Sequence, residues 1–345
     1  MKTRSLQNYS ASVGVEAYDI DWNCPEEIKA LGKLCASQCV VFVDEQIPSE
    51  TLYDTMMQWG DPSRAFIHDA VISKKLQGRH WREIMLNLGF INKEIDTKFK
   101  DAMSIVSYKR DAKNKPKGIF QNGELNWHSD QCAFDDGQRI IGLQSISDTA
   151  NSQTEFLCTH DAYELLSSDM KSMVKELVVK HRWIDHVMAP GLDYAQTLLI
   201  RYNQVPLAGM ETKLYRETCS GLPGMKIPAH SFDGFRDMSR SESDKIMDEL
   251  RKVCMKDEYT YTQNWKDGQL VFMDQEITLH RRPTNIKDGN QRTMVRVISY
   301  LNKLFDNEQS KILENIRYDG SLYDFDNFLE LVDEDRKKTF ELIEQ

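Results

Sequence analysis

Three side chains have the types and spacing to hold one metal ion. His128 and Asp130 lie two residues apart in NWHSD (126–130). In an extended strand, two such side chains point to the same face and reach one cation. A distant imidazole, that of His280, would complete a set of two imidazoles and one carboxylate. This donor set is typical of non-haem Fe(II) and leaves coordination positions open for a co-substrate and O2.

Arg292 and Arg296 lie in an otherwise apolar, strand-like run, RTMVRVISY (292–300). Because strand side chains alternate, both arginines face the same way. A buried guanidinium is costly unless an anion pairs with it, and arginine binds a carboxylate through two parallel hydrogen bonds. The anion is either on a bound small molecule or on an internal Asp or Glu. Roughly 13 Å of strand separates the two arginines, so they cannot bind the same end of one small dicarboxylate.

The apolar patterns predict the elements that must position these residues. Helical spacing covers 25–38 and 48–59, on either side of a short apolar run at 40–43. Two more helices are expected around 160–178 and 242–254, the second opened by a capping-box pattern in SESD (241–244). Short strands are expected over 125–128, 140–146, 198–202, 259–261, 269–273 and 293–300. This pattern predicts a mostly β fold with flanking helices (α+β) and a double-stranded β-helix core, a jelly-roll or cupin-like double sheet.

The order of the motifs resembles one known family. WHSD (127–130), His280 after DGQLVFMD (267–274), and two arginines in the next strand are similar to motifs of the taurine dioxygenase family of Fe(II)/2-oxoglutarate enzymes. VVFVDEQ (40–46) resembles the family's first strand and following turn, and the likeness covers roughly residues 12–300. The resemblance implies a 2-oxoglutarate-dependent non-haem iron dioxygenase that uses Fe(II), 2-oxoglutarate and O2. The iron ligands would be His128, Asp130 and His280.

Three more residues acquire roles from this resemblance. Arg292 matches the arginine that binds 2-oxoglutarate. Thr154 matches the threonine of a Gly-Gly-x-Thr turn that helps this arginine, although NSQT (151–154) keeps neither glycine. Arg296 matches a position that, in the taurine enzyme, helps to hold the anionic group of the substrate.

The expected reaction is the oxidation of an unactivated C–H group. We expect hydroxylation or desaturation of a small anionic or zwitterionic metabolite, an amino acid or a derivative of one, with release of succinate and CO2. Halogenation is disfavoured because a halogenase must free the position of Asp130 for chloride. Two alternatives stay open: a metal-free cupin-like binding protein without catalysis, and a nucleobase or nucleic-acid demethylase of the same fold.

The distribution of charge and apolar residues narrows the partners. The net charge is −10, and no basic stripe of the kind that binds nucleic acid is visible. We therefore expect a small-molecule substrate and no nucleic-acid partner. No run of about 18 apolar residues exists, and no apolar segment follows the basic start of the chain. We expect a cytoplasmic protein without a membrane partner.

The sequence predicts one large domain with an appendage. Residues 1–300 would form the Fe(II)/2-oxoglutarate dioxygenase domain. Residues 301–345, with twelve acidic and six basic side chains, would form an acidic C-terminal helical extension. Its amphipathic pattern leaves three roles open: packing on the core, covering the mouth of the site, or contacting another subunit in a homo-oligomer.

Overall fold

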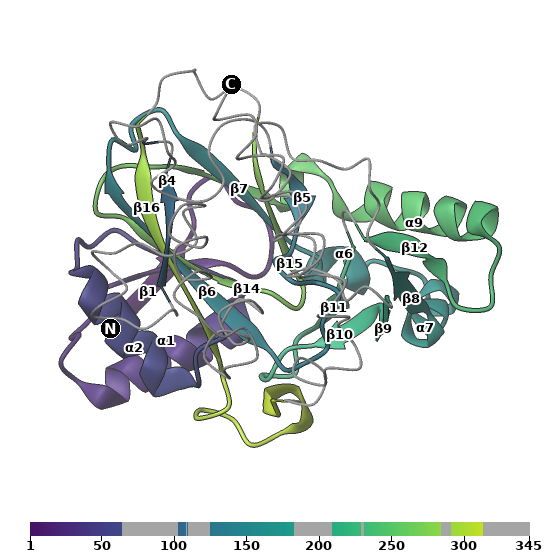
Figure 1. Cartoon of the computed structure of the whole chain (residues 1–345), viewed down its shortest axis with the longest axis horizontal. Coiled ribbons are helices and arrows are strands. Elements are labelled where there is room, and N and C mark those ends of the chain that lie inside the picture. The colour runs from purple at the N-terminus through teal and green to yellow at the C-terminus, as the bar shows by residue number, and fades with distance from the viewer. Residues whose placement is uncertain are drawn as a thin grey trace, which may run out of the picture.

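A computed structural model describes residues 1–63, 103–107, 109, 125–182, 209–228, 231–283 and 291–312. Its two main sheets face each other, with β16 and β6 in one sheet and β7, β15 and β5 in the other (Figure 1). The larger sheet has the order β1 (Lys2–Ser5), β2 (Val15–Tyr18), β3 (Val40–Val43), β14 (Leu270–Asp274), β6 (Arg139–Ser147), β16 (Thr293–Tyr300) and β4 (Met103–Ser107). The smaller has the order β13 (Thr260–Asn264), β7 (Gln153–Cys158), β15 (Thr278–Arg282) and β5 (Leu125–His128). The predicted fold class, a jelly-roll core with few helices, is confirmed.

The two faces of the larger sheet bury different partners. Helices α1 (Pro25–Gln38) and α2 (Ser49–Trp59) cover one face, against a cluster of buried side chains that includes Val41, Val43, Phe272, Val295 and Val297. The alternating residues Leu143, Met273 and Met294 point to the other face and line the pocket between the sheets. This explains why β14 and β16 are apolar almost throughout, since both of their faces are covered.

The two N-terminal helices form where their patterns predicted them. Pro25 is the first residue of α1, where a missing N–H costs no hydrogen bond, and Glu26 and Glu27 follow in the first turn. The second helix begins at Ser49, and Pro48 is its N-cap. The indole of Trp59 donates a hydrogen bond to the Ile28 carbonyl at 2.8 Å and joins the two helices.

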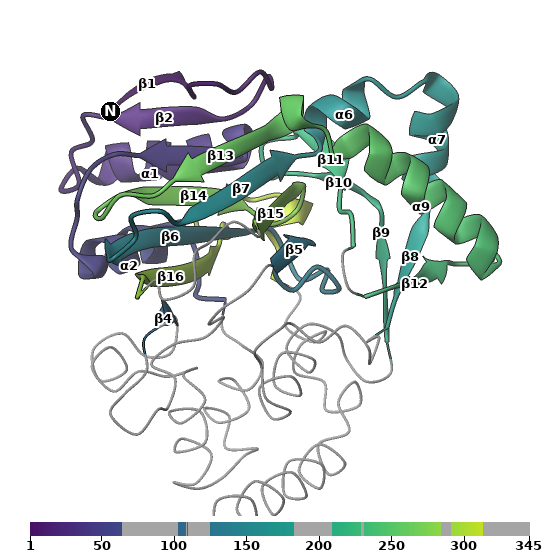
Figure 2. The ribbon, with the colours of Figure 1, turned by 90° about the horizontal axis from the view of Figure 1, so that it is seen from above.

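A second group of elements lies beside the main sheets (Figure 2). It contains a three-stranded sheet of order β12 (Phe232–Phe235), β8 (Val178–His181) and β9 (Met210–Lys213), and the two-stranded sheet β10 (Tyr215–Glu217) and β11 (Pro223–Met225). Around them are α6 (His160–Glu164), α7 (Ser168–Glu176), α9 (Arg240–Cys254) and the 3-10 turn η1 (Asp257–Tyr259). The helix expected around 160–178 is therefore two helices, and the strands β8 to β12 were not predicted.

Helix α9 begins earlier than its sequence suggested. Its N-cap is Ser239, whose hydroxyl accepts from the Glu242 N–H while the Glu242 carboxylate accepts from the Ser239 N–H. The predicted cap at Ser241 is wrong by two residues. The expected pattern paired Ser241 with Asp244, three residues later. In the structure Ser239 and Glu242, which have the same spacing, form the capping box.

Some expectations lie outside the described residues. The strand expected at 198–202 is among them, and so is the part of the C-terminal extension from 313 to 345. Residues 301–312 are described and contain the 3-10 turn η2 (Glu308–Ser310). The division into a 1–300 domain and a 301–345 extension stays a prediction. Among the described helices, none is long and apolar enough to cross a membrane.

Candidate active site

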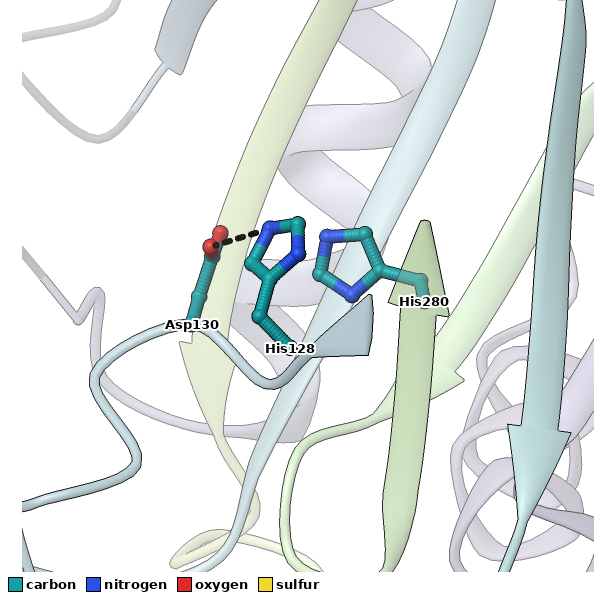
Figure 3. Close-up of side chains that lie close together, drawn as sticks. All are labelled: His128, Asp130 and His280. Atoms are coloured by element: carbon teal, nitrogen blue, oxygen red, sulfur yellow. Dashed lines mark ion pairs between the residues drawn. The ribbon is translucent and has the colours of Figure 1, made fainter. Parts of the chain in front are cut away.

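Two neighbouring strands, and the turn that follows one of them, bring His128, Asp130 and His280 together (Figure 3). His280, in β15, is the direct cross-strand partner of His128, the last residue of β5. The centroids of the two imidazole rings are 4.2 Å apart. His128 Nε2 lies 3.7 Å from Asp130 Oδ1, and one ligand atom from each of the three residues lies within 4.8 Å of the other two. In the described parts of the chain this is the one such group of three.

Asp130 reaches the site from a turn, not from a strand. Strand β5 ends at His128, and Gln131 has a positive φ of 57° that turns the chain away. Gln275, just before β15, holds this turn: its carbonyl accepts from the Ser129 hydroxyl at 2.7 Å, and its side-chain oxygen accepts from the Asp130 N–H at 2.9 Å. The expectation that both ligands lie on one extended strand is corrected, although both side chains still converge.

A second turn supports His280 from the other side. Asp274 ends β14, and its Oδ2 accepts from the backbone N–H groups of Glu276 and Ile277 at 2.9 and 2.7 Å. Its Oδ1 accepts from Gln138 Nε2 at 2.6 Å. Burial, with the nearby Glu276, raises the pKa of Asp274 to about 6, although these hydrogen bonds oppose the rise. The carboxyl group thus shapes the turn that leads into β15.

The electrostatics of the three residues favour a neutral imidazole beside an ionised carboxylate. Burial lowers the pKa of His280 to about 3. Burial alone would raise the pKa of Asp130, but the Arg296 guanidinium and the two imidazoles hold it below its ordinary value. The Nδ1 of His128 is 2.6 Å from the Asn126 carbonyl. A carbonyl only accepts, so Nδ1 donates in this contact.

A pocket between the sheets contains these residues and the predicted anion-binding residues. Arg292, Met294 and Arg296 all line it, as their period-two spacing predicted, and Thr154 on β7 also lines it. Arg296 Nη1 donates to Asp130 Oδ2 at 2.6 Å, and its Nε donates to Ser104 at 3.2 Å. The structure therefore brings together all six residues that the sequence singled out: His128, Asp130, Thr154, His280, Arg292 and Arg296.

Thr154 follows a turn that lacks the two glycines of the family's pattern. Asn151, at the position of the first glycine, has a positive φ of 66°. Asparagine tolerates this left-handed conformation better than most other residues. The Ser152 N–H and hydroxyl both donate to the Thr149 carbonyl, at 2.9 and 2.7 Å, and close the turn.

Comparison with known proteins identifies the family. The sequence profile described as "Taurine catabolism dioxygenase TauD, TfdA family" matches residues 3–298. The chain belongs to the TauD/TfdA family. As a member, it is a 2-oxoglutarate-dependent non-haem iron dioxygenase that uses Fe(II), 2-oxoglutarate and O2. A search of curated proteins returned no match.

Solved structures share the TauD/TfdA fold with this chain. A taurine dioxygenase from Burkholderia xenovorans superposes with a TM-score of 0.58 at 18% identity, over 86% of this chain and 89% of that one. AAD-2, solved in complex with Mn(II) and N-oxalylglycine, superposes with a TM-score of 0.58 at 16% identity, over 86% of this chain and 96% of that one. At such low identity the likeness concerns the fold alone.

The residues of this TauD/TfdA enzyme fit Fe(II). Two imidazoles and one carboxylate supply three donors and leave the remaining positions to other ligands. His280 Nδ1 is buried and makes no hydrogen bond with a described residue, so no described protein group competes for that nitrogen. His128 Nδ1 donates to the Asn126 carbonyl and Arg296 donates to Asp130, and such hydrogen bonds would orient two of the three donors.

Sequence reasoning missed two arginines and a tryptophan in this TauD/TfdA site. Arg281 and Arg282 follow His280 in β15 and line the pocket. Arg281 pairs with Glu155 and lies over the Trp127 ring, 4.6 Å from its centroid. The period of two that places Arg282 on the face of His280 was readable in the sequence. Trp265, which donates to Thr154, had no sequence signal.

The other two described histidines, His160 and His181, have structural roles. Both ring nitrogens of His181 are hydrogen-bonded, to the hydroxyls of Ser231 and Thr212 at 2.8 Å each. Burial lowers the pKa of His181 to about 3, so its ring is neutral. His160 begins α6 and contacts the Pro223 carbonyl at 2.7 Å.

Proposed function

We propose that this enzyme hydroxylates or desaturates an unactivated C–H group of a small anionic or zwitterionic metabolite, an amino acid or a derivative of one. In this proposal His128, Asp130 and His280 hold the iron. Bound Fe(II), with 2-oxoglutarate and O2, supplies the oxidising chemistry that releases succinate and CO2. The protein's own residues bind, orient and shield the reactants.

The observation that carries the substrate class is the charge of the pocket. Among its described lining residues are four arginines, at 281, 282, 292 and 296, but only one carboxylate, that of Asp130. Arg281 pairs with Glu155 and Arg296 with Asp130. A bound Fe(II) ion and a 2-oxoglutarate dianion add no net charge, so arginines still outnumber carboxylates when both pairs are counted. Arginine binds carboxylates and sulfonates with paired N–H groups, which favours a substrate that carries such a group.

The two arginines on the β16 side divide the anions between them in this proposal. Arg292 binds the distal carboxylate of 2-oxoglutarate together with the Thr154 hydroxyl. Arg296 lies next to the iron ligand Asp130 and binds the anionic group of the substrate. A guanidinium has five N–H donors, so Arg296 can contact Asp130 and a substrate anion at once. The apolar side chains Leu143 and Met294, close by, would contact the carbon part of the substrate.

A screen for substrate-dependent succinate release tests the proposal. The purified enzyme with Fe(II), 2-oxoglutarate and O2 is offered amino acids, sulfonates and betaines, each paired with an analogue in which an uncharged amide or sulfonamide replaces the anionic group. We expect only compounds with a free carboxylate or sulfonate to stimulate succinate release. Equal stimulation by the analogues without the anionic group would overturn the substrate class. Stimulation by a methylated oligonucleotide instead would favour the demethylase alternative.

A binding measurement separates catalysis from the metal-free alternative. Anaerobic titration should show one Fe(II) bound per chain, and addition of 2-oxoglutarate should produce a weak visible charge-transfer band. Loss of both signals in the His280→Ala variant would assign them to the proposed site. A wild-type protein without either signal would support a binding protein that lacks catalysis.

A further inference from the structure

Trp265 contacts the segment that carries Thr154 twice. It follows β13, the strand that pairs with β7, and its side chain is buried. Its indole Nε1 donates to Thr154 Oγ1 at 2.9 Å, and its backbone N–H donates to the Ser152 carbonyl at 3.1 Å. One residue thus holds both the turn before β7 and the hydroxyl at the start of β7.

The indole contact determines what the Thr154 hydroxyl can do. An indole N–H only donates, so the Thr154 oxygen must accept, and the hydroxyl proton is directed elsewhere. Among the described residues, no acceptor is hydrogen-bonded to that proton. Thr154 itself lines the pocket that also contains Arg292. A buried O–H donor held in this way is ready for an acceptor that enters the pocket.

We infer that Trp265 is a positioning residue for 2-oxoglutarate. It fixes the Thr154 hydroxyl so that its proton points to the distal carboxylate of 2-oxoglutarate, beside Arg292. Accepting a hydrogen bond from the indole also makes the hydroxyl a better donor, because hydrogen bonds in a chain strengthen one another. Trp265 is not among the residues that line the pocket, so it acts through Thr154. The inference rests on the proposed role of Thr154 and Arg292 in binding 2-oxoglutarate.

A double-mutant cycle tests this coupling. The affinity for 2-oxoglutarate is measured by calorimetry with the Mn(II)-loaded full chain, so that no turnover is required. Trp265→Phe keeps most of the ring and removes the N–H. We expect it to weaken 2-oxoglutarate binding about two- to tenfold, the range for one neutral hydrogen bond. In the Thr154→Val background, Trp265→Phe should have no further effect, because its partner hydroxyl is already gone.

Trp59→Phe is the matched control. Trp59 is also buried, and its Nε1 also donates one hydrogen bond, to the Ile28 carbonyl at 2.8 Å, but between α1 and α2. This variant should lower the stability of the protein and leave 2-oxoglutarate affinity unchanged. A loss of affinity equal to that of Trp265→Phe would mean that general destabilisation explains both, which overturns the inference.

The remaining outcomes separate the inference from the proposed function. If Thr154→Val weakens binding and Trp265→Phe does not, the positioning role is wrong and the proposed site stands. If neither Thr154→Val nor Arg292→Ala changes the affinity, the proposed 2-oxoglutarate site is wrong.

Should Trp265→Phe fail to fold, Thr154→Ser replaces it. Serine lacks the methyl group that restricts the rotamer of threonine, so its hydroxyl is fixed only if another group holds it. If the Trp265 indole holds it, the 2-oxoglutarate affinity of Thr154→Ser should stay within about twofold of wild type. Binding as weak as that of Thr154→Val would overturn the inference.

Discussion

Arg296 donates a hydrogen bond from Nη1 to Asp130 Oδ2 at 2.6 Å and so connects β16 to the turn that follows β5. The second oxygen of the same carboxylate, Oδ1, lies 3.7 Å from His128 Nε2. The guanidinium thus engages one oxygen and leaves the other beside the imidazole. The sequence predicted that Arg296 would pair with an anion. In the structure that anion is Asp130, a proposed metal ligand, and Arg296 also lines the pocket.

Replacing Arg296 should therefore affect both the metal and the substrate. Partners of metal ligands typically change metal affinity about 10- to 100-fold when removed. We expect Arg296→Ala to weaken Fe(II) binding in this range and to raise the KM for the substrate, with 2-oxoglutarate affinity nearly unchanged. Arg296→Lys keeps the charge and should lie between Ala and wild type. Anaerobic Fe(II) titration measures the effect. Tighter Fe(II) binding in Arg296→Ala would show that charge repulsion outweighs orientation.

Removing any one of the three proposed iron ligands should abolish turnover. His128→Ala, Asp130→Ala and His280→Ala each leave only two protein donors, while the fold depends on many other contacts. Succinate formation should disappear, and circular dichroism should remain close to that of wild type. His160→Ala, a histidine at the start of α6, is the control and should keep its turnover. Near-normal succinate formation by His280→Ala would disprove the triad.

Loss of Arg292 should specifically weaken 2-oxoglutarate binding. Truncating one partner of a buried charge-assisted pair costs roughly 2–5 kcal/mol. Arg292→Ala should therefore raise the 2-oxoglutarate requirement about 30-fold or more, while Fe(II) binding changes little. Steady-state kinetics at varied 2-oxoglutarate concentration measure this requirement. An unchanged requirement here, with the rise in Arg296→Ala, would mean that the two arginines have exchanged roles.

Asp274 should make the stability of the protein depend on pH. Its pKa is about 6 in the folded protein, against an ordinary 3.8. A raised pKa adds stability that is fully present below pH 3.8 and is lost as pH rises through 6. The loss is on the order of 3 kcal/mol. Asp274→Asn cannot ionise, so the stability of wild type relative to this variant should fall between about pH 4 and pH 7. Chemical denaturation at several pH values measures the difference, and parallel pH profiles would contradict the prediction.

The cap of α9 offers a test of local stability with a built-in control. Ser239→Ala removes the hydroxyl that accepts from the Glu242 N–H and should cost about 1 kcal/mol. Ser241→Ala, two residues later and exposed, removes no cap and should change the unfolding free energy by less than about 0.5 kcal/mol. Denaturant midpoints compare the two variants. A larger loss in Ser241→Ala than in Ser239→Ala would mean that the cap lies at Ser241.

The sequence by itself determined the features that depend on local spacing. The bounds of α1, β3, β5 and β16 follow from apolar periods and from proline at helix starts, which act within a few residues. The same local rule placed Arg292 and Arg296 on one face of their strand. The chemistry of two imidazoles and a carboxylate was readable because the donor types themselves restrict the metal.

Only the tertiary structure decided which of these side chains meet. Arg296 and Asp130 are 166 residues apart, Asp130 and Gln275 are 145 apart, and Trp265 and Thr154 are 111 apart. Each contact depends on the register between strands and on how the two sheets pack. A shift of one residue would turn every side chain of a strand to the opposite face. The pattern of one strand does not specify its partner or its register. The partners of Arg296, Asp130 and Thr154 therefore became known only when β16, β5, β7 and β13 were placed in their sheets.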